Sequence, residues 1–163
     1  MFKRIKTAAL ILIATVLFLT GCSTDKYSED ISCRELSSVV AELDEAEYSE
    51  YGEEYIAFFL EEDAERIDDF CVLYTTEVND INEIGFFRAV SNEGAGELYE
   101  ELRDYLEDKR EGERAFVGSY APQELPKLDG GQVRRFGRYV VYAIADADMR
   151  GEIFSGVKAR LEK

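Results

Sequence analysis

The sequence contains no histidine and no tryptophan, and only two of its 163 residues are proline. Without histidine the chain cannot form a Ser-His-Asp or Cys-His catalytic arrangement. It also lacks the commonest side-chain ligand of protein metal sites. The acidic runs have neither the alternating aspartates nor the central glycine and terminal glutamate of a calcium loop. Most hydrolase mechanisms are therefore excluded, and no metal, cofactor or catalytic residue is expected.

Cations are also scarce, because 19 Lys and Arg residues stand against 35 Asp and Glu residues, for a formal net charge of −16. Such a surface repels nucleic acid and anionic lipid headgroups, so neither is expected to bind it through charge. One cluster departs from this background, and it consists of Arg134, Arg135 and Arg138. A guanidinium forks two hydrogen bonds to a carboxylate. We therefore predict a partner contact at these arginines, the alternative being a hairpin face that pairs with the protein's own acids.

The chain has one long apolar run, from Ala8 to Leu19, which is shorter than the roughly 20 residues of a membrane-spanning helix. Three cations precede it, at Lys3, Arg4 and Lys6. A positive start, an apolar stretch and a small-residue cleavage site are typical of a secretory signal peptide.

The run ends in Leu19-Thr20-Gly21-Cys22, which resembles the lipobox of bacterial lipoproteins. In a lipobox the cysteine thiol is acylated and the chain is cut before it. The resemblance implies a signal peptide at 1–21, a lipid on Cys22, and attachment to the extracytoplasmic face of the cell membrane. A plain secretory signal and an ordinary N-terminal membrane anchor are the alternatives.

Cleavage before Cys22 removes three of the 19 cations and none of the 35 anions, which leaves a net charge of −19. The lipid must then hold a domain that electrostatics would repel from the bilayer, and two or three acyl chains suffice for stable attachment. Residues 22–31 are predicted to form a short polar tether. Residues 32–163 suit a single domain with a sizeable core.

The two remaining cysteines are Cys33 and Cys71. Outside the cytoplasm a disulfide between them is chemically permitted. The alternative is a pair of buried free thiols, and only geometry decides between the two. A nucleophilic role is not expected for either cysteine.

Periodicity predicts the elements of the first half. Ser32 and Glu35 form a capping box, and apolar residues at helical spacing predict a helix from Cys33 to Ala46. A second helix is predicted from Tyr48 to Phe59. The β-rich stretches 70–76 and 84–90 then predict a pair of strands.

From residue 70 onward, the middle and the end of the chain both follow the order strand, strand, helix. A long amphipathic helix is predicted around 98–109, ending before Pro122. Strands are predicted at 132–136 and 139–145, followed by a last helix capped by Asp146 or Asp148. The expected fold is α+β: one domain with about four mostly antiparallel strands, helices packed on one face, and one or two helices before the sheet.

Several short motifs resemble a family of small lipoproteins from Gram-positive bacteria that is known only as a domain of unknown function. They are Asn82-Glu83-Ile84-Gly85-Phe86-Phe87, Tyr120-Ala121-Pro122-Gln123-Glu124-Leu125, Gly137-Arg138-Tyr139-Val140 and Ile144-Ala145-Asp146. The resemblance covers roughly residues 70–161. It implies no substrate, cofactor or catalytic residue.

Three classes of function remain. The expected one is a non-catalytic interaction domain that a lipid on Cys22 holds at the cell envelope, where it binds a protein or another envelope component. The second is a hydrolase of cell-wall glycan that uses two carboxylates, one with a pKa raised by burial. The third is a small solute-binding lipoprotein, which would need a deep pocket with convergent polar groups.

Overall fold

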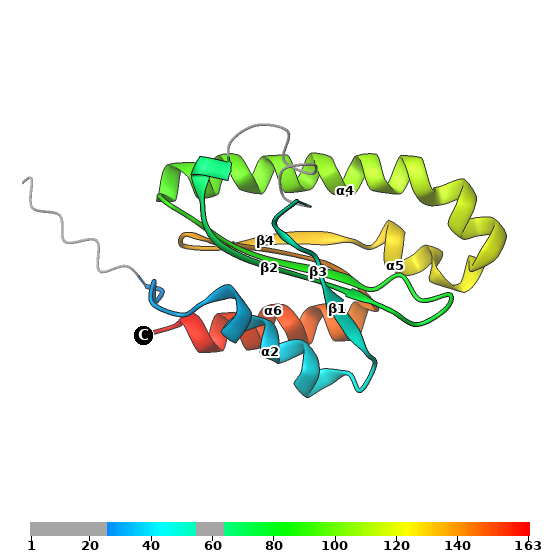
Figure 1. The fold of residues 1–163 in the computed structure, drawn as a ribbon, viewed down its shortest axis with the longest axis horizontal. Helices are drawn as coiled ribbons and strands as arrows, with labels where there is room; N and C mark the ends of the chain where they lie inside the picture. The colour runs from blue at the N-terminus through cyan, green and yellow to red at the C-terminus, as the bar shows by residue number, and fades with distance from the viewer. Residues whose placement is uncertain (1–25, 55–63) are drawn as a thin grey trace, which may run out of the picture.

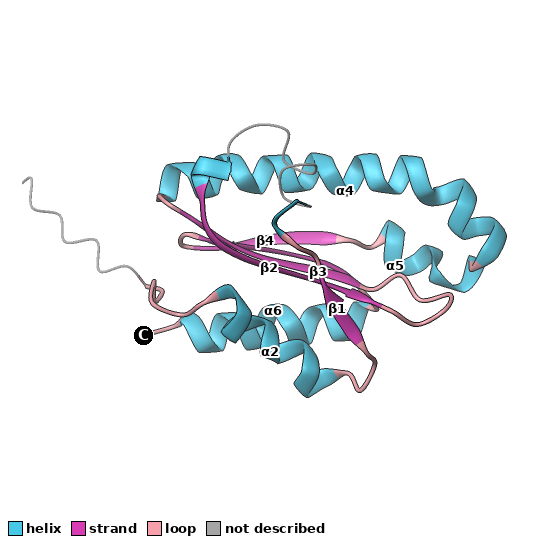
Figure 2. Cartoon of the chain, viewed as in Figure 1, coloured by secondary structure: helices cyan, strands magenta, loops and turns pink. Residues whose placement is uncertain are grey.

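The sheet of this protein is antiparallel throughout, with five strands in the order β1-β2-β3-β5-β4. A computed structural model describes residues 26–54 and 64–163. The lipobox and Cys22 lie outside the described residues, as do residues 55–63. The described elements are α2 (Cys33–Leu43), β1 (Tyr48–Glu50), β2 (Ile67–Thr75), β3 (Glu83–Ala89), α4 (Asn92–Tyr120), α5 (Leu125–Asp129), β4 (Gln132–Phe136), β5 (Tyr139–Ile144) and α6 (Ala147–Leu161). The α+β class predicted from the sequence is confirmed (Figures 1 and 2).

Helices cover both faces of the sheet: α4 lies on one face, while α2 and α6 lie on the other (Figure 1). Successive strand residues point to opposite faces, so Phe86 joins the core under α2 and α6. Its neighbour Phe87 joins the core under α4. All six residues of β5 are buried, as expected for a strand covered on both sides. The prediction that helices pack on one face was therefore wrong.

The fifth strand is β1, which occupies the start of the predicted second helix. Tyr48, Ser49 and Glu50 pair with Thr75, Tyr74 and Leu73 of β2. The helix predicted from Tyr48 is therefore wrong at its start, because pairing with β2 overrides the helical spacing of the aromatic residues. Most of the rest of that predicted helix falls in residues 55–63, outside the described part.

The helix ends follow local capping rules. The Ser32 hydroxyl accepts a hydrogen bond from the Glu35 backbone N–H at 3.1 Å, as the capping box predicts. Helix α4 ends directly before Ala121-Pro122. Asp146 occupies the N-cap position of α6, but its side chain makes no capping hydrogen bond. No helix in the described ranges is long and apolar enough to cross a membrane.

Both ends of the described chain meet at one end of the molecule. Tyr27 forms an isolated β-bridge with Glu162, and the Ser28 N–H donates to the Leu161 carbonyl at 2.7 Å. The Tyr27 ring packs edge-on against Phe136, 5.9 Å between centroids. Residues 26–31 of the predicted 22–31 tether are thus part of the fold.

Candidate functional site

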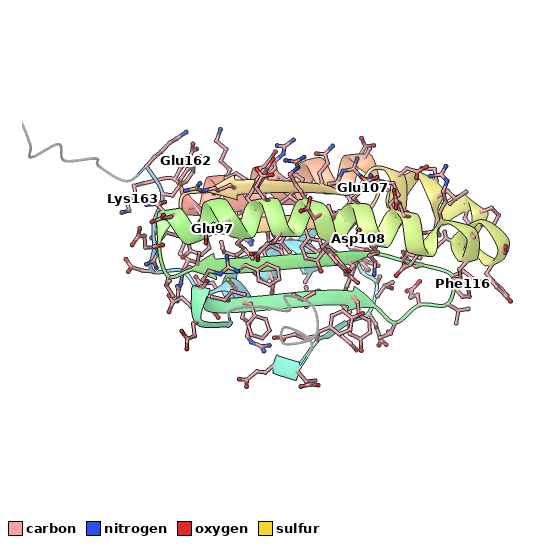
Figure 3. The ribbon with its side chains drawn as sticks, turned by 90° about the horizontal axis from the view of Figure 1, so that it is seen from above. Glu97, Glu107, Asp108, Phe116, Glu162 and Lys163 are labelled. Atoms are coloured by element: carbon pink, nitrogen blue, oxygen red, sulfur yellow. The ribbon has the colours of Figure 1, made fainter. Side chains whose placement is uncertain are left out.

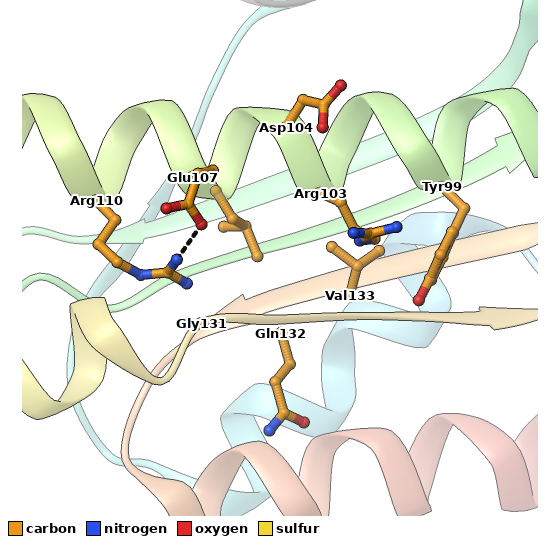
Figure 4. A pocket seen from close by; sticks show the side chains of 9 residues that line it. Tyr99, Arg103, Asp104, Glu107, Arg110, Gly131, Gln132 and Val133 are labelled. Carbon is orange, nitrogen blue, oxygen red and sulfur yellow. Dashed lines mark hydrogen bonds and ion pairs between the residues drawn. The ribbon is translucent and has the colours of Figure 1, made fainter.

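The candidate site is a surface groove between α4 and strand β4, with a volume of about 380 Å³. One wall comes from α4 and includes Tyr99 and Arg103. The other wall is the backbone of 131–133 (Figure 4). Figure 4 shows Val133 pointing toward α4 and Gln132 pointing away from it. The groove therefore runs along the open side of β4, and the apolar side chains of Leu106 and Val133 are among its lining residues.

Charged side chains of α4 line this groove in pairs. Arg103 donates to Glu100 at 2.6 Å, and Arg110 pairs with Glu107. Asp104 also lines the groove, and it has no ion pair with another described residue. The walls therefore carry both signs of charge, and most of that charge is already compensated within one turn of the helix.

Strand β4 forms one edge of the sheet, because it pairs with β5 alone among the described strands. The hairpin between them turns at Gly137 and Arg138, where Gly137 has φ = 62°. A glycine with positive φ at the first central position is the signature of a two-residue type II′ hairpin. Phe136 and Tyr139, the pair that closes the turn, therefore exchange hydrogen bonds across the ladder. Alternation then points the backbone N–H and C=O groups of Val133 and Arg135 away from β5.

The structure does not bring Arg134, Arg135 and Arg138 together as one patch. Neighbouring residues of a strand face opposite sides, so Arg135 lies on the α4 side, where it donates to the Asn92 carbonyl at 2.7 Å and to the Gly137 carbonyl at 2.8 Å. Arg138 donates to the Val90 carbonyl at 3.2 Å and faces Asp68 at 3.6 Å. Both side chains help to hold the hairpin to the rest of the domain.

Arg134 differs from the other two. Its guanidinium lies over the Phe154 ring of α6, 4.6 Å from the ring centroid, and it makes no ion pair with a described residue. Arg150 of α6 lies close enough to interact with it. Burial lowers the pKa of Arg150 below its usual value, and the positive charge of Arg134 lowers it further against the opposing effect of Asp146.

The two predicted disulfide partners are buried free thiols in the structure, which was the alternative that the sequence left open. Cys33 donates from Sγ to the Asp69 carbonyl at 3.3 Å. Burial raises the pKa of Cys33, and the nearby Asp69 charge raises it further. Burial also raises the pKa of Cys71. Both thiols are held in the protonated form, which is unreactive as a nucleophile.

A buried carboxylate that the sequence analysis did not single out lies at the start of β3. Glu83 is 4% exposed and accepts hydrogen bonds from Tyr105 at 2.6 Å and from Tyr142 at 2.9 Å. Its second oxygen pairs with Lys109 at 3.1 Å. The sequence offered one signal of this site, which is an ionisable residue at the start of an apolar strand. The partners of Glu83 come from α4 and β5, which are distant in the chain. Because all its oxygens are engaged, Glu83 serves to join three elements.

Other acidic side chains beside surface hollows also have structural partners. A hollow of about 440 Å³ borders β1 and β2, and Asp68, Asp69 and Glu50 lie among its lining residues. Asp68 pairs with Arg88 at 2.8 Å, and Asp69 accepts the Cys33 backbone N–H at 2.7 Å. Glu50 pairs with Arg34 at 2.7 Å. These carboxylates connect α2 to β1 and β2, and β2 to β3.

Comparison with known proteins identifies no relative, because no family model, no curated protein and no solved structure matches this chain. Within the described ranges, no three Cys, Asp or Glu side chains gather in a way that would hold a metal ion. The resemblance to the Gram-positive lipoprotein family stays a prediction.

Proposed function

We propose that this protein is a lipid-anchored lipoprotein of the extracytoplasmic membrane face, and that it binds an envelope protein without catalysing a reaction. The observation that carries the interaction role is the groove between α4 and the open edge of β4. It combines outward backbone groups of β4 with the half-buried apolar side chain of Val133, while Arg134, which makes no ion pair with a described residue, lies on the α6 side of the same strand. Such a combination suits recognition of a polypeptide, and it requires no catalytic group.

The position of the chain ends supports the anchoring role. Lys26 and Lys163 lie together, with the Lys163 N–H 3.3 Å from the Lys26 carbonyl. Lys26 follows Cys22 by four positions, and this stretch spans at most about 14 Å. A lipid on Cys22 would therefore keep this end of the domain close to the bilayer.

The opposite end of the molecule carries an exposed aromatic pair. Phe116 and Tyr120 are 65% and 70% exposed, and their ring centroids are 4.7 Å apart. Figure 3 shows Phe116 at the far end of α4 from Glu162 and Lys163. Helix α4 has 29 residues and so extends about 43 Å. The groove along α4 would thus begin near the anchored end and run away from it.

The outward face of α4 is acidic. Glu97 and Asp108 project from it (Figure 3), and both are exposed. Since anionic headgroups repel such a face, the domain should present α4 and the neighbouring groove away from the bilayer surface. That orientation leaves the groove accessible to a protein partner.

Replacing Cys22 with alanine tests the anchor. We expect the protein to leave the membrane fraction almost completely, because no charged surface would retain it without the acyl chains. Cell fractionation followed by immunoblotting measures this, with Cys33→Ala as the matched control that should stay with the membrane. Unchanged membrane association of Cys22→Ala would contradict lipidation at this residue.

In-cell photo-crosslinking tests the interaction role. A photoreactive amino acid at Gln132, which is exposed on β4, is expected to capture one protein reproducibly from intact cells. The same amino acid at Glu45 is the control, because this exposed residue lies beside β1 at the other edge of the sheet. Capture of the same proteins from both positions, or of none from Gln132, would count against the groove as the contact site.

A further inference from the structure

We propose that the partner binds as an extended strand that adds to the free edge of β4 and places a carboxylate beside Arg134. This inference rests on the proposed function, because it specifies how a partner occupies the same groove. The added strand would become the sixth of the sheet and lie between α4 and α6.

The backbone of β4 offers the necessary hydrogen bonds. In the register of the β4–β5 hairpin, Val133 and Arg135 point both of their backbone polar groups outward. No described residue donates to or accepts from these four groups beyond the ladder. Strand addition satisfies such groups with main-chain hydrogen bonds, which supply affinity with little dependence on sequence.

The two sides of β4 then determine which side chains the added strand carries. On the α4 side, the groove of about 380 Å³ has room beside Val133 and Tyr99 for one apolar or small polar side chain. On the α6 side, the next residue of the added strand would face Arg134 and Gln132. A strand that alternates between these sides matches both surfaces at a period of two residues.

Charge favours an acidic residue on the α6 side. Arg134 makes no ion pair with a described residue, and its guanidinium lies over the Phe154 ring, 4.6 Å from the ring centroid. A partner carboxylate at this point would accept hydrogen bonds from the Arg134 guanidinium and compensate its charge.

A second copy of the chain is disfavoured as the occupant. Two β4 edges in antiparallel pairing would bring Arg134 and Arg135 of one copy next to the same arginines of the other. Like charges directly opposite each other destabilise a pair of strands, and charged side chains are a common way to keep sheet edges from joining. The edge of β4 therefore disfavours pairing with β4 of a second copy and favours pairing with an acidic strand.

Amide hydrogen exchange of the full-length protein in detergent tests this inference with two synthetic peptides. Each has about six residues and alternates valine with threonine, with a central glutamate in one and a central lysine in the other. The glutamate peptide is expected to slow exchange at the Val133 and Arg135 amides at least tenfold. Exchange at Arg134 should not change, because the ladder already protects its amide. The lysine peptide should bind at least tenfold more weakly.

Two variants separate the backbone from the side chain. Val133→Pro removes the outward N–H without breaking a ladder bond and should abolish peptide binding, whereas Val133→Ala keeps the N–H and should bind the peptide. Arg134→Glu should reverse the preference between the two peptides. If the proline variant is unfolded, a glutamate peptide methylated at its backbone nitrogens gives the same comparison with the unmodified protein.

The outcomes that would overturn the inference are distinct from failure of the proposed function. Capture of a partner from Gln132 without peptide protection at Val133 and Arg135 would retain the groove and reject strand addition. Protection that grows with protein concentration in the absence of peptide, together with a dimer in sedimentation, would identify a second copy as the occupant. Equal binding of the glutamate and lysine peptides would reject the carboxylate site at Arg134.

Discussion

Replacing Glu83 with alanine is expected to lower the free energy of unfolding by about 3 kcal/mol, as for a buried ion pair that loses one partner. The change leaves Lys109, whose side chain is only 16% exposed, without its buried counter-charge. It also removes the acceptor of the Tyr105 and Tyr142 hydroxyls. The loss stays at the lower end of the range for buried pairs, because Lys109 keeps Glu113 at 3.1 Å. Urea unfolding followed by circular dichroism at neutral pH measures it.

The matched control is Glu113→Gln, which removes the exposed partner of the same lysine. It should cost less than about 1 kcal/mol, because water screens a half-exposed ion pair. Burial alone would lower the pKa of Lys109, but the charges of Glu83 and Glu113 raise it above its usual value. The lysine is therefore charged at neutral pH, and its contribution is lost only as the pH rises past the ordinary lysine range. Equal losses of unfolding free energy in the Glu83 and Glu113 variants would show that burial does not determine how much each carboxylate contributes to stability.

Replacing Gly85 with alanine is expected to cost about 2 to 3 kcal/mol through overpacking. A Cβ at this position would lie 2.2 Å from Cε1 of Tyr142 and 2.7 Å from Cε2 of Phe87. Gly85 and Tyr142 are direct cross-strand partners, and the Tyr142 ring lies over the space that a side chain would fill. The ring has little freedom to move, because its hydroxyl binds Glu83 and it packs against Phe87 and Tyr105.

Gly112→Ala is the control for this prediction. Nothing lies within 4 Å of a Cβ at Gly112, which is exposed in the interior of α4, so alanine should stabilise the protein by about 0.5 to 1 kcal/mol. Thermal or urea unfolding of the two variants should therefore shift in opposite directions. An unfolding midpoint of Gly85→Ala at or above that of the unchanged protein would refute the packing argument. The double variant of Glu83 and Gly85 should be non-additive, because both changes act on Tyr142.

Most of the secondary structure was predictable, because its signals lie within a few residues of one another. The capping box at Ser32 began α2, and Pro122 ended α4 where expected. The hairpin at Gly137 joined two strands in the predicted places. Each of these signals acts through neighbours in the chain, so no knowledge of the tertiary structure was needed.

The failures have a common physical cause. The spacing of Tyr48 and Tyr51 suits a helix, yet β2 lies close enough to pair with Tyr48–Glu50 as a strand. The arginines of the second hairpin cluster in sequence, but alternation along β4 sends Arg134 and Arg135 to opposite faces. In both cases strand geometry decides the outcome: β2 imposes it on Tyr48–Glu50 from a distant part of the chain, and along β4 a one-residue offset reverses the side on which a residue lies.

The sequence by itself determined the type of most elements, the acidic charge and the exclusion of histidine-based chemistry, and it carries the lipobox on which the predicted location rests. Only the tertiary structure decided that helices cover both faces of the sheet, that β4 forms an open edge beside a groove, and that Glu83 is buried. Those properties arise between residues far apart in the chain: Glu83 meets Tyr142 across 59 positions and Lys109 across 26. Local periodicity sets how a segment folds, whereas long-range packing decides what that segment faces.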